Sequence, residues 1–154
     1  MCNTELRGSS GVIESPNFPN PYPHSRNCTW VIAAPLGNRV NLTFSHFDVE
    51  SHSPSPSGTG VICAYDFVEI RQPNGTLGRF CSSALPTEIG STQDKVMVQF
   101  VSDMSVAHNG FRLEWRVIGN RSNTNMPLIL PAQINITYFL FHSLYFTRMW
   151  RKIG

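Results

Sequence analysis

The sequence is short of charge and of helical periodicity. Charged residues make up 14% of its 154 residues, whereas a soluble domain usually has about a quarter. No long segment repeats its apolar residues every 3.6 positions, so no helical fold is predicted. Gly and Pro are plentiful instead, with 11 of each, and they favour short strands joined by frequent turns. The length fits one domain, and a hydrophobic fraction of 41% is sufficient for a core.

A basic surface interleaved with aromatic residues, the mark of nucleic-acid binding, is also missing. All ten acidic residues and eight of the Lys and Arg residues precede residue 118, which gives residues 1–117 a net charge of −2. The other four bases lie in residues 118–154, and they account for the net charge of +2 of the whole chain. We therefore expect no nucleic-acid partner.

Motifs of the common enzyme classes are absent. No serine lies in Gly-x-Ser-x-Gly, and the sequence has neither His-Glu-x-x-His nor a glycine-rich phosphate loop. Nothing places two acids at the separation that glycoside hydrolysis needs. His24 and His46 are better explained as surface or strand residues than as catalytic bases. We expect no catalytic residue and no enzymatic activity in this chain.

Four cysteines are present, and none of them forms the Cys-x-x-Cys spacing of a structural zinc site. Their even number fits two disulfides, for which four cysteines allow three pairings. They are Cys2, Cys28, Cys63 and Cys81. A cytosolic protein with four free thiols is the alternative.

Glycosylation sequons, Asn-x-Ser/Thr, favour an extracellular or cell-surface protein. The predicted sites are Asn27, Asn41, Asn74 and Asn120, and a fifth sequon begins at Asn135. Met1 is followed at once by Cys2, without the apolar stretch of a signal peptide. We interpret this start as that of an excised or partial chain that lacks its signal peptide.

Alternating apolar and polar residues predict half-buried strands at residues 40–45 and 111–117. Further strands are predicted at 29–33, 67–71 and 95–101. Turns are predicted at 35–38, 73–75 and 108–110, with Asn74-Gly75 as a hairpin signal. Four prolines exclude a helix from residues 8–24, and residues 51–60 form a surface loop. Many short strands with frequent turns predict an all-β fold, an antiparallel β-sandwich.

The composition changes after Val117. Residues 119–127 are polar, and residues 128–146 are apolar and aromatic but are interrupted by Pro131, Gln133, Asn135 and His142. These interruptions argue against a membrane-spanning helix. We expect residues 118–154 to be an irregular C-terminal tail outside the domain. The alternative is a membrane-surface segment with its basic end at residues 148–152.

An ordered series of motifs over residues 2–117 resembles the CUB domain family. The motifs are residues 15–23 (Ser-Pro-Asn-Phe-Pro-Asn-Pro-Tyr-Pro), 27–30 (Asn-Cys-Thr-Trp), 42–50 (Leu-Thr-Phe-Ser-His-Phe-Asp-Val-Glu), 63–70 (Cys-Ala-Tyr-Asp-Phe-Val-Glu-Ile), 78–81 (Gly-Arg-Phe-Cys), 98–103 (Val-Gln-Phe-Val-Ser-Asp) and 110–115 (Gly-Phe-Arg-Leu-Glu-Trp). The resemblance implies a CUB domain at 2–117 with a jelly-roll-like sandwich. It also implies the disulfides Cys2–Cys28 and Cys63–Cys81. The segment between Glu50 and Cys63 is longer than is typical of the family.

The resemblance further implies a calcium site. Its carboxylates would come from Glu50, Asp66 and Asp103, with further oxygens from Ser105 and Val106, and Tyr22 or Tyr65 would brace the acids. Calcium takes six to eight oxygen ligands, so three carboxylates with carbonyls and water suffice. Spacing alone does not reveal the site, because acids 16 and 37 positions apart could equally be separate surface charges.

The implied function is that of an extracellular, calcium-dependent protein-binding module. Calcium would fix the three acids so that they accept charge-assisted hydrogen bonds from a Lys or Arg of a protein ligand. The motifs are most like those of a multi-CUB endocytic receptor, which implies neighbouring CUB modules, ligands such as cobalamin carrier complexes, and only indirect membrane contact. The alternative is a structural or exosite module of a secreted protease or of a developmental ectodomain protein.

Overall fold

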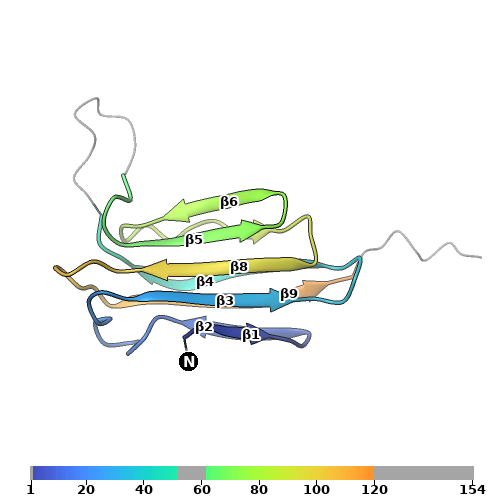
Figure 1. Ribbon diagram of the computed structural model, residues 1–154, viewed down its shortest axis with the longest axis horizontal. Helices are drawn as coiled ribbons and strands as arrows, with labels where there is room; N and C mark the ends of the chain where they lie inside the picture. The colour runs from blue at the N-terminus through green and yellow to red at the C-terminus, as the bar shows by residue number, and fades with distance from the viewer. Residues whose placement is uncertain (1, 52–61, 120–154) are drawn as a thin grey trace, which may run out of the picture. The chain divides into compact units, whose positions relative to one another are not determined.

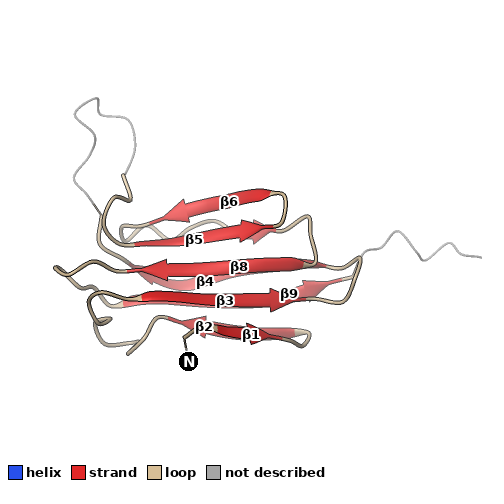
Figure 2. Cartoon of the chain, viewed as in Figure 1, coloured by secondary structure: helices blue, strands red, loops and turns tan. Residues whose placement is uncertain are grey.

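The computed structural model describes residues 2–51 and 62–119, and these residues form strands and no helix (Figures 1 and 2). The predicted all-β sandwich is confirmed. Within these ranges no helix is long and apolar enough to cross a membrane. The predictions for the loop at 51–60, for Asn120 and for the tail beyond residue 119 concern residues outside the described part, except for Ser51.

Two sheets make up the sandwich. The five-stranded sheet has the order β1 (Thr4–Leu6), β3 (Asn27–Ala33), β8 (Lys95–Val101), β5 (Phe67–Gln72) and β6 (Gly75–Phe80). The four-stranded sheet has the order β2 (Ser10–Glu14), β9 (Gly110–Ile118), β4 (Arg39–Asp48) and β7 (Ile89–Gly90). All neighbouring strands are antiparallel except β1 and β3, which are parallel.

The five predicted strands are present as β3, β4, β5, β8 and β9, of which β4 and β9 are the two predicted from alternation. The short strands β1, β2 and β7 were not predicted, because two to five residues are too few to show a period. The predicted hairpin joins β5 to β6, but its turn lies one residue earlier than Asn74-Gly75. Gln72 pairs with Gly75, so Pro73 and Asn74 form the turn, in keeping with the preference of proline for the second position of a β-turn.

The core consists of the inward-facing residues of both sheets. Phe111 is at its centre, with ring-centroid distances of 6.1 Å to Trp30, 6.0 Å to Phe44 and 5.6 Å to Phe100. Edge-to-face contacts of this kind add to the stabilisation that comes from burying the rings. Trp30 and Phe100 belong to the five-stranded sheet, whereas Phe44 and Phe111 belong to the other, so this cluster holds the two sheets together.

Two disulfides join Cys2 to Cys28 and Cys63 to Cys81, the pairs that the resemblance implied. The first fastens the segment before β1 to the interior strand β3. The second closes the β5–β6 hairpin at its open end. The linked cysteines are 26 and 18 residues apart, and loops of this length give about 3 kcal/mol of stabilisation each through the unfolded chain.

One end of the sandwich collects segments that are far apart in the sequence. Strands β4 and β8 end there and β5 begins there, at the left of Figure 1. The β5–β6 turn lies at the opposite end.

Gly110, the first residue of β9, allows the backbone at this end of the sandwich to lie close to Ser15. Its φ is 82°, and a Cβ at this position would lie 1.9 Å from Ser15 Oγ. Ser15 is buried, and its hydroxyl accepts the Phe111 N–H at 3.0 Å. Only glycine fits both the backbone conformation and the space.

We predict that Gly110→Ala lowers the free energy of unfolding by about 3 kcal/mol, since backbone strain and overpacking add. Gly37→Ala is the matched control, because Gly37 has a φ of 80° but no heavy atom within 4 Å of the added Cβ; it should cost about 1 kcal/mol. Urea unfolding of both variants measures the difference. Equal losses would show that the contact with Ser15 is unimportant.

Candidate metal centre

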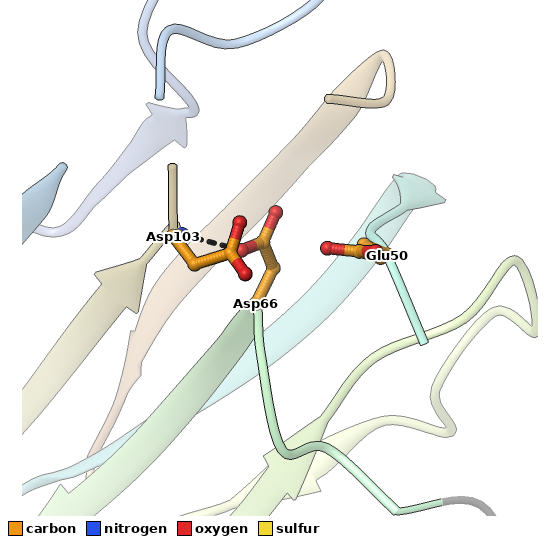
Figure 3. A group of neighbouring side chains, drawn as sticks. All are labelled: Glu50, Asp66 and Asp103. Atoms are coloured by element: carbon orange, nitrogen blue, oxygen red, sulfur yellow. Dashed lines mark hydrogen bonds between the residues drawn. The ribbon is translucent and has the colours of Figure 1, made fainter. Parts of the chain in front are cut away.

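Three carboxylates converge at the end of the sandwich where β4 and β8 finish. Glu50 follows β4 by two residues, Asp66 directly precedes β5, and Asp103 follows β8 by two residues. In Figure 3 the three side chains point toward one another from three different segments. One oxygen of each carboxylate lies within 4.8 Å of the others. The fold therefore brings together the acids that the spacing left apart.

This separation suits a calcium ion. Oxygen ligands lie about 2.3–2.6 Å from calcium, so two ligands of one ion can be at most about 5 Å apart. Without a cation, three carboxylates this close repel one another. Asp66 is fully buried, and Glu50 and Asp103 are half-buried. The donor set consists of hard oxygens, which calcium prefers over the nitrogen and sulfur ligands of zinc.

Asp66 is held by two hydrogen bonds. The Tyr22 hydroxyl donates to its Oδ2 at 2.6 Å, and the Asp103 N–H donates to its Oδ1 at 2.7 Å, the bond dashed in Figure 3. The two bonds fix the orientation of the carboxylate. The protein itself therefore holds this candidate ligand in one orientation.

Tyr22 links Asp66 to Glu50. Its oxygen accepts the Glu50 N–H at 3.1 Å while its proton is donated to Asp66. Burial raises the pKa of Tyr22, and the hydrogen bond to Asp66 raises it further, so the phenol keeps its proton. The ring is 1% exposed and packs edge-on against Phe100 at 5.0 Å. Of the two tyrosines suggested as braces, Tyr22 makes these contacts.

Asp103 is tied to the loop that follows it. Its Oδ1 accepts the Ser105 N–H at 2.7 Å, and the Ser105 hydroxyl lies 3.1 Å from the same oxygen. The loop thus keeps the Ser105 hydroxyl beside the carboxylate. Val106 lies in the same loop and is 55% exposed. Because its side chain has no oxygen, only its backbone carbonyl could be a ligand.

The structure adds supporting residues that sequence reasoning missed. The Asp48 carboxylate lies 3.0 Å from His108 Nδ1 and accepts the Asn109 N–H at 3.3 Å. The His108 carbonyl in turn accepts the Tyr22 N–H at 3.0 Å. Asp48 and His108 are 60 positions apart, and no sequence signal joins them. Their contacts fix the 104–109 loop against the Tyr22 segment.

The predicted glycosylation sites have different surroundings. Asn27 and Asn74 are exposed, at the start of β3 and in the β5–β6 turn. Asn41 is half-buried on β4, and its amide donates to Glu88 Oε1. The Asn27 Oδ1 accepts from Gln99 Nε2 at 2.9 Å. Glycosylation at these positions stays a prediction.

Known proteins are similar to this chain in sequence and in fold. The family described as CUB domain matches residues 2–115. Tolloid-like protein 1 of Homo sapiens is 38% identical over 115 residues, which are 72% of this chain and 11% of that protein. Cubilin of Rattus norvegicus is 35% identical over 119 residues, which are 76% of this chain and 3% of that protein. The chain thus spans a small part of the curated relatives that it matches.

A solved structure is similar to this chain in sequence and in fold. The MASP-1 CUB2 domain bound to Ca2+ superposes with a TM-score of 0.68 at 32% identity, over 75% of this chain and 99% of that domain. With a family match over residues 2–115, this chain belongs to the CUB domain family.

Proposed function

We propose that this chain is an extracellular module that binds protein partners through a calcium ion held by Glu50, Asp66 and Asp103. The observation that carries the proposal is the convergence of three carboxylate oxygens within 4.8 Å of one another. The calcium bound by the similar MASP-1 CUB2 domain supports it. A calcium ion in this site would neutralise the clustered negative charge and would fix the positions of the three carboxylates.

The ligand set extends beyond the acids. Ser105 has its hydroxyl beside Asp103, and the backbone carbonyl of Val106 lies in the same loop. With water, these groups complete the six to eight oxygens that calcium requires. No residue on the other faces of the sandwich is needed.

The loaded site still attracts a cation. Three carboxylates carry −3 and calcium carries +2, which leaves a formal charge of −1. We expect a Lys or Arg of a partner to form charge-assisted hydrogen bonds to this acidic cluster of Glu50, Asp66 and Asp103 through the half-buried Glu50 and Asp103. The buried Asp66 would contribute to partner binding through the metal and through its negative charge.

Exposed apolar side chains flank the two aspartates. Ile62 and Tyr65, both 43% exposed, precede Asp66, and Met104 and Val106, at 85% and 55%, follow Asp103. Half of the large apolar side chains that are exposed in the described residues lie in these two places. They suit the methylene stem of a lysine and its apolar neighbours in a partner. Such a mixed surface resembles an interface core surrounded by polar groups.

The parent protein is proposed to be a multi-CUB endocytic receptor of the cubilin kind, with neighbouring CUB modules and ligands such as cobalamin carrier complexes. The 35% identity with cubilin supports this class. Because one lysine contact is weak, several modules would bind by avidity. In this setting the module is extracellular, and its contact with the membrane is indirect.

A second candidate is a structural or exosite module of a secreted protease or of a developmental ectodomain protein. The 38% identity with Tolloid-like protein 1 favours this class. In either case the chain itself is proposed to bind rather than to catalyse. The domains that flank it in its parent sequence would separate the two classes.

Calcium should stabilise the full chain. At a concentration about 100 times the Kd, the free energy of unfolding rises by about 2.7 kcal/mol, and the Tm by roughly 10 °C. Asp103→Ala should not be stabilised by calcium. Glu114→Gln changes an exposed acid on β9 of the four-stranded sheet, and this variant should be stabilised as much as the wild type. Thermal melts in calcium and in EGTA test the prediction. An equal gain for Asp103→Ala would remove Asp103 from the site.

Partner recognition should depend on a positively charged side chain, for which lysine serves as the probe. In NMR titrations of the calcium-loaded chain, Nα-acetyl-lysine amide should shift the backbone signals of Asp66 and Asp103, and EGTA should abolish the shifts. Nα,Nε-diacetyl-lysine amide, which lacks the charge, is the matched control probe. Shifts of the same size with the control probe, or in EGTA, would contradict capture of lysine at the metal.

A further inference from the structure

A buried serine fastens the segment that carries Tyr22 to the end of β8. Ser102 is 4% exposed. Its hydroxyl donates to the Pro23 carbonyl at 2.8 Å and accepts the Arg26 N–H at 3.0 Å. Its own N–H donates to the Arg26 carbonyl at 2.9 Å. One side chain therefore satisfies both a donor and an acceptor of the 23–26 loop.

A fourth bond continues this connection to a proposed calcium ligand. The Ser25 N–H donates to the Asp103 carbonyl at 2.6 Å. The 23–26 loop is thus hydrogen-bonded to both Ser102 and Asp103. Ser25 has a φ of 55°, a conformation that L-residues seldom adopt. This backbone shape needs surrounding contacts to maintain it, and the bonds to Ser102 and Asp103 supply them.

Both ends of the connection meet on Asp66. Tyr22, directly before the 23–26 loop, donates to Asp66 Oδ2, and Asp103, next to Ser102, donates its N–H to Asp66 Oδ1. A shift of the loop relative to β8 would therefore change the two bonds that orient this buried carboxylate. The Ser102 hydroxyl touches none of the three acids with its own hydrogen bonds, so its effect on them is indirect.

We infer that Ser102 is a positioning residue for the calcium site, which sets calcium affinity by holding the Tyr22 segment and Asp103 in register around Asp66. The inference rests on the proposed function and adds a residue that is not itself a ligand. It assigns to the hydroxyl a role beyond that of filling a buried space.

Ser91 is a matched control. It is also 4% exposed, and its hydroxyl accepts the Val40 N–H at 2.8 Å and donates to the Gln93 carbonyl at 2.7 Å. Val40 lies near the beginning of β4, at the end of the sandwich opposite the acids. Replacing either serine by alanine leaves one backbone N–H and one backbone carbonyl without their hydrogen-bond partner. The two changes should therefore lower the free energy of unfolding by similar amounts.

The test compares Ser102→Ala, Ser91→Ala and Ser102→Thr in the full chain. In calorimetric titration with calcium, Ser102→Ala should raise the Kd about tenfold. The free energy of about one hydrogen bond corresponds to a tenfold change in Kd. Ser91→Ala should stay within about twofold of the wild type, and Ser102→Thr, which keeps the hydroxyl, should regain most of the affinity. Urea unfolding in EGTA should show similar losses for the two alanine variants.

A second measurement does not depend on bound calcium. In EGTA, hydrogen exchange at the Ser25 and Arg26 amides should become faster in Ser102→Ala and should stay unchanged in Ser91→Ala. The effects of Ser102→Ala and Tyr22→Phe on calcium affinity should not add, because both changes act on the same series of contacts. The affinity of the double variant should therefore lie within about twofold of that of the weaker single variant.

Equal affinity in Ser102→Ala and in the wild type would overturn the inference and leave the proposed function standing. Equal weakening in Ser91→Ala would also overturn it, because lost stability alone would then explain the effect. If the wild type binds no calcium, the proposed function fails and the inference fails with it. If Ser102→Ala does not fold, normal affinity in Tyr22→Phe would overturn the inference.

Discussion

A carboxylate with no exposure to water needs donors, and the fully buried Asp66 imposes this requirement on everything around it. An ionised group in the interior is costly unless hydrogen bonds or opposite charge compensate it. Here the donors come from Tyr22 and from the backbone of Asp103, which belong to different parts of the chain. The segment before β3, the end of β8 and the start of β5 are therefore positioned by one side chain. The other two acids gain their places from the same contacts, since Tyr22 also accepts from the Glu50 amide.

The sandwich provides the rigidity that this arrangement requires. Tyr22 rests on Phe100 of β8, and Phe100 rests on Phe111 of β9, so the phenol is anchored in the core that joins the two sheets. The disulfide between Cys63 and Cys81 ties down the chain three residues before Asp66. A polar site at the rim thus depends on apolar packing beneath it, which holds side chains to fractions of an ångström in a close-packed interior.

Sequence reasoning reached the fold through patterns that are local. The alternation of Phe111, Leu113, Trp115 and Val117 is long enough to identify β9, whereas three residues of β1 carry no period. The acids were found through their motif contexts, because their spacing holds no information about distance in space. The hydrogen bonds that organise the site could not be predicted from the sequence for the same reason. Tyr22 and Asp66 are 44 positions apart, and Ser102 and Arg26 are 76 apart. The burial of Asp66 follows from how two sheets close, which no single segment reveals.

The disulfide between Cys2 and Cys28 has a mechanical consequence. Tension applied at Cys2 passes through the disulfide to Cys28 at the start of an interior strand. Strand β3 is bonded along its whole length to β8 in antiparallel register, so the force loads many hydrogen bonds in shear instead of peeling β1 away one bond at a time. The same strand β8 leads directly into Ser102 and Asp103. A force applied at the N-terminal end would therefore be resisted by β8, the strand that leads into the acidic site. The Cys2–Cys28 disulfide protects the edge strand β1 from being separated from β3 one hydrogen bond at a time.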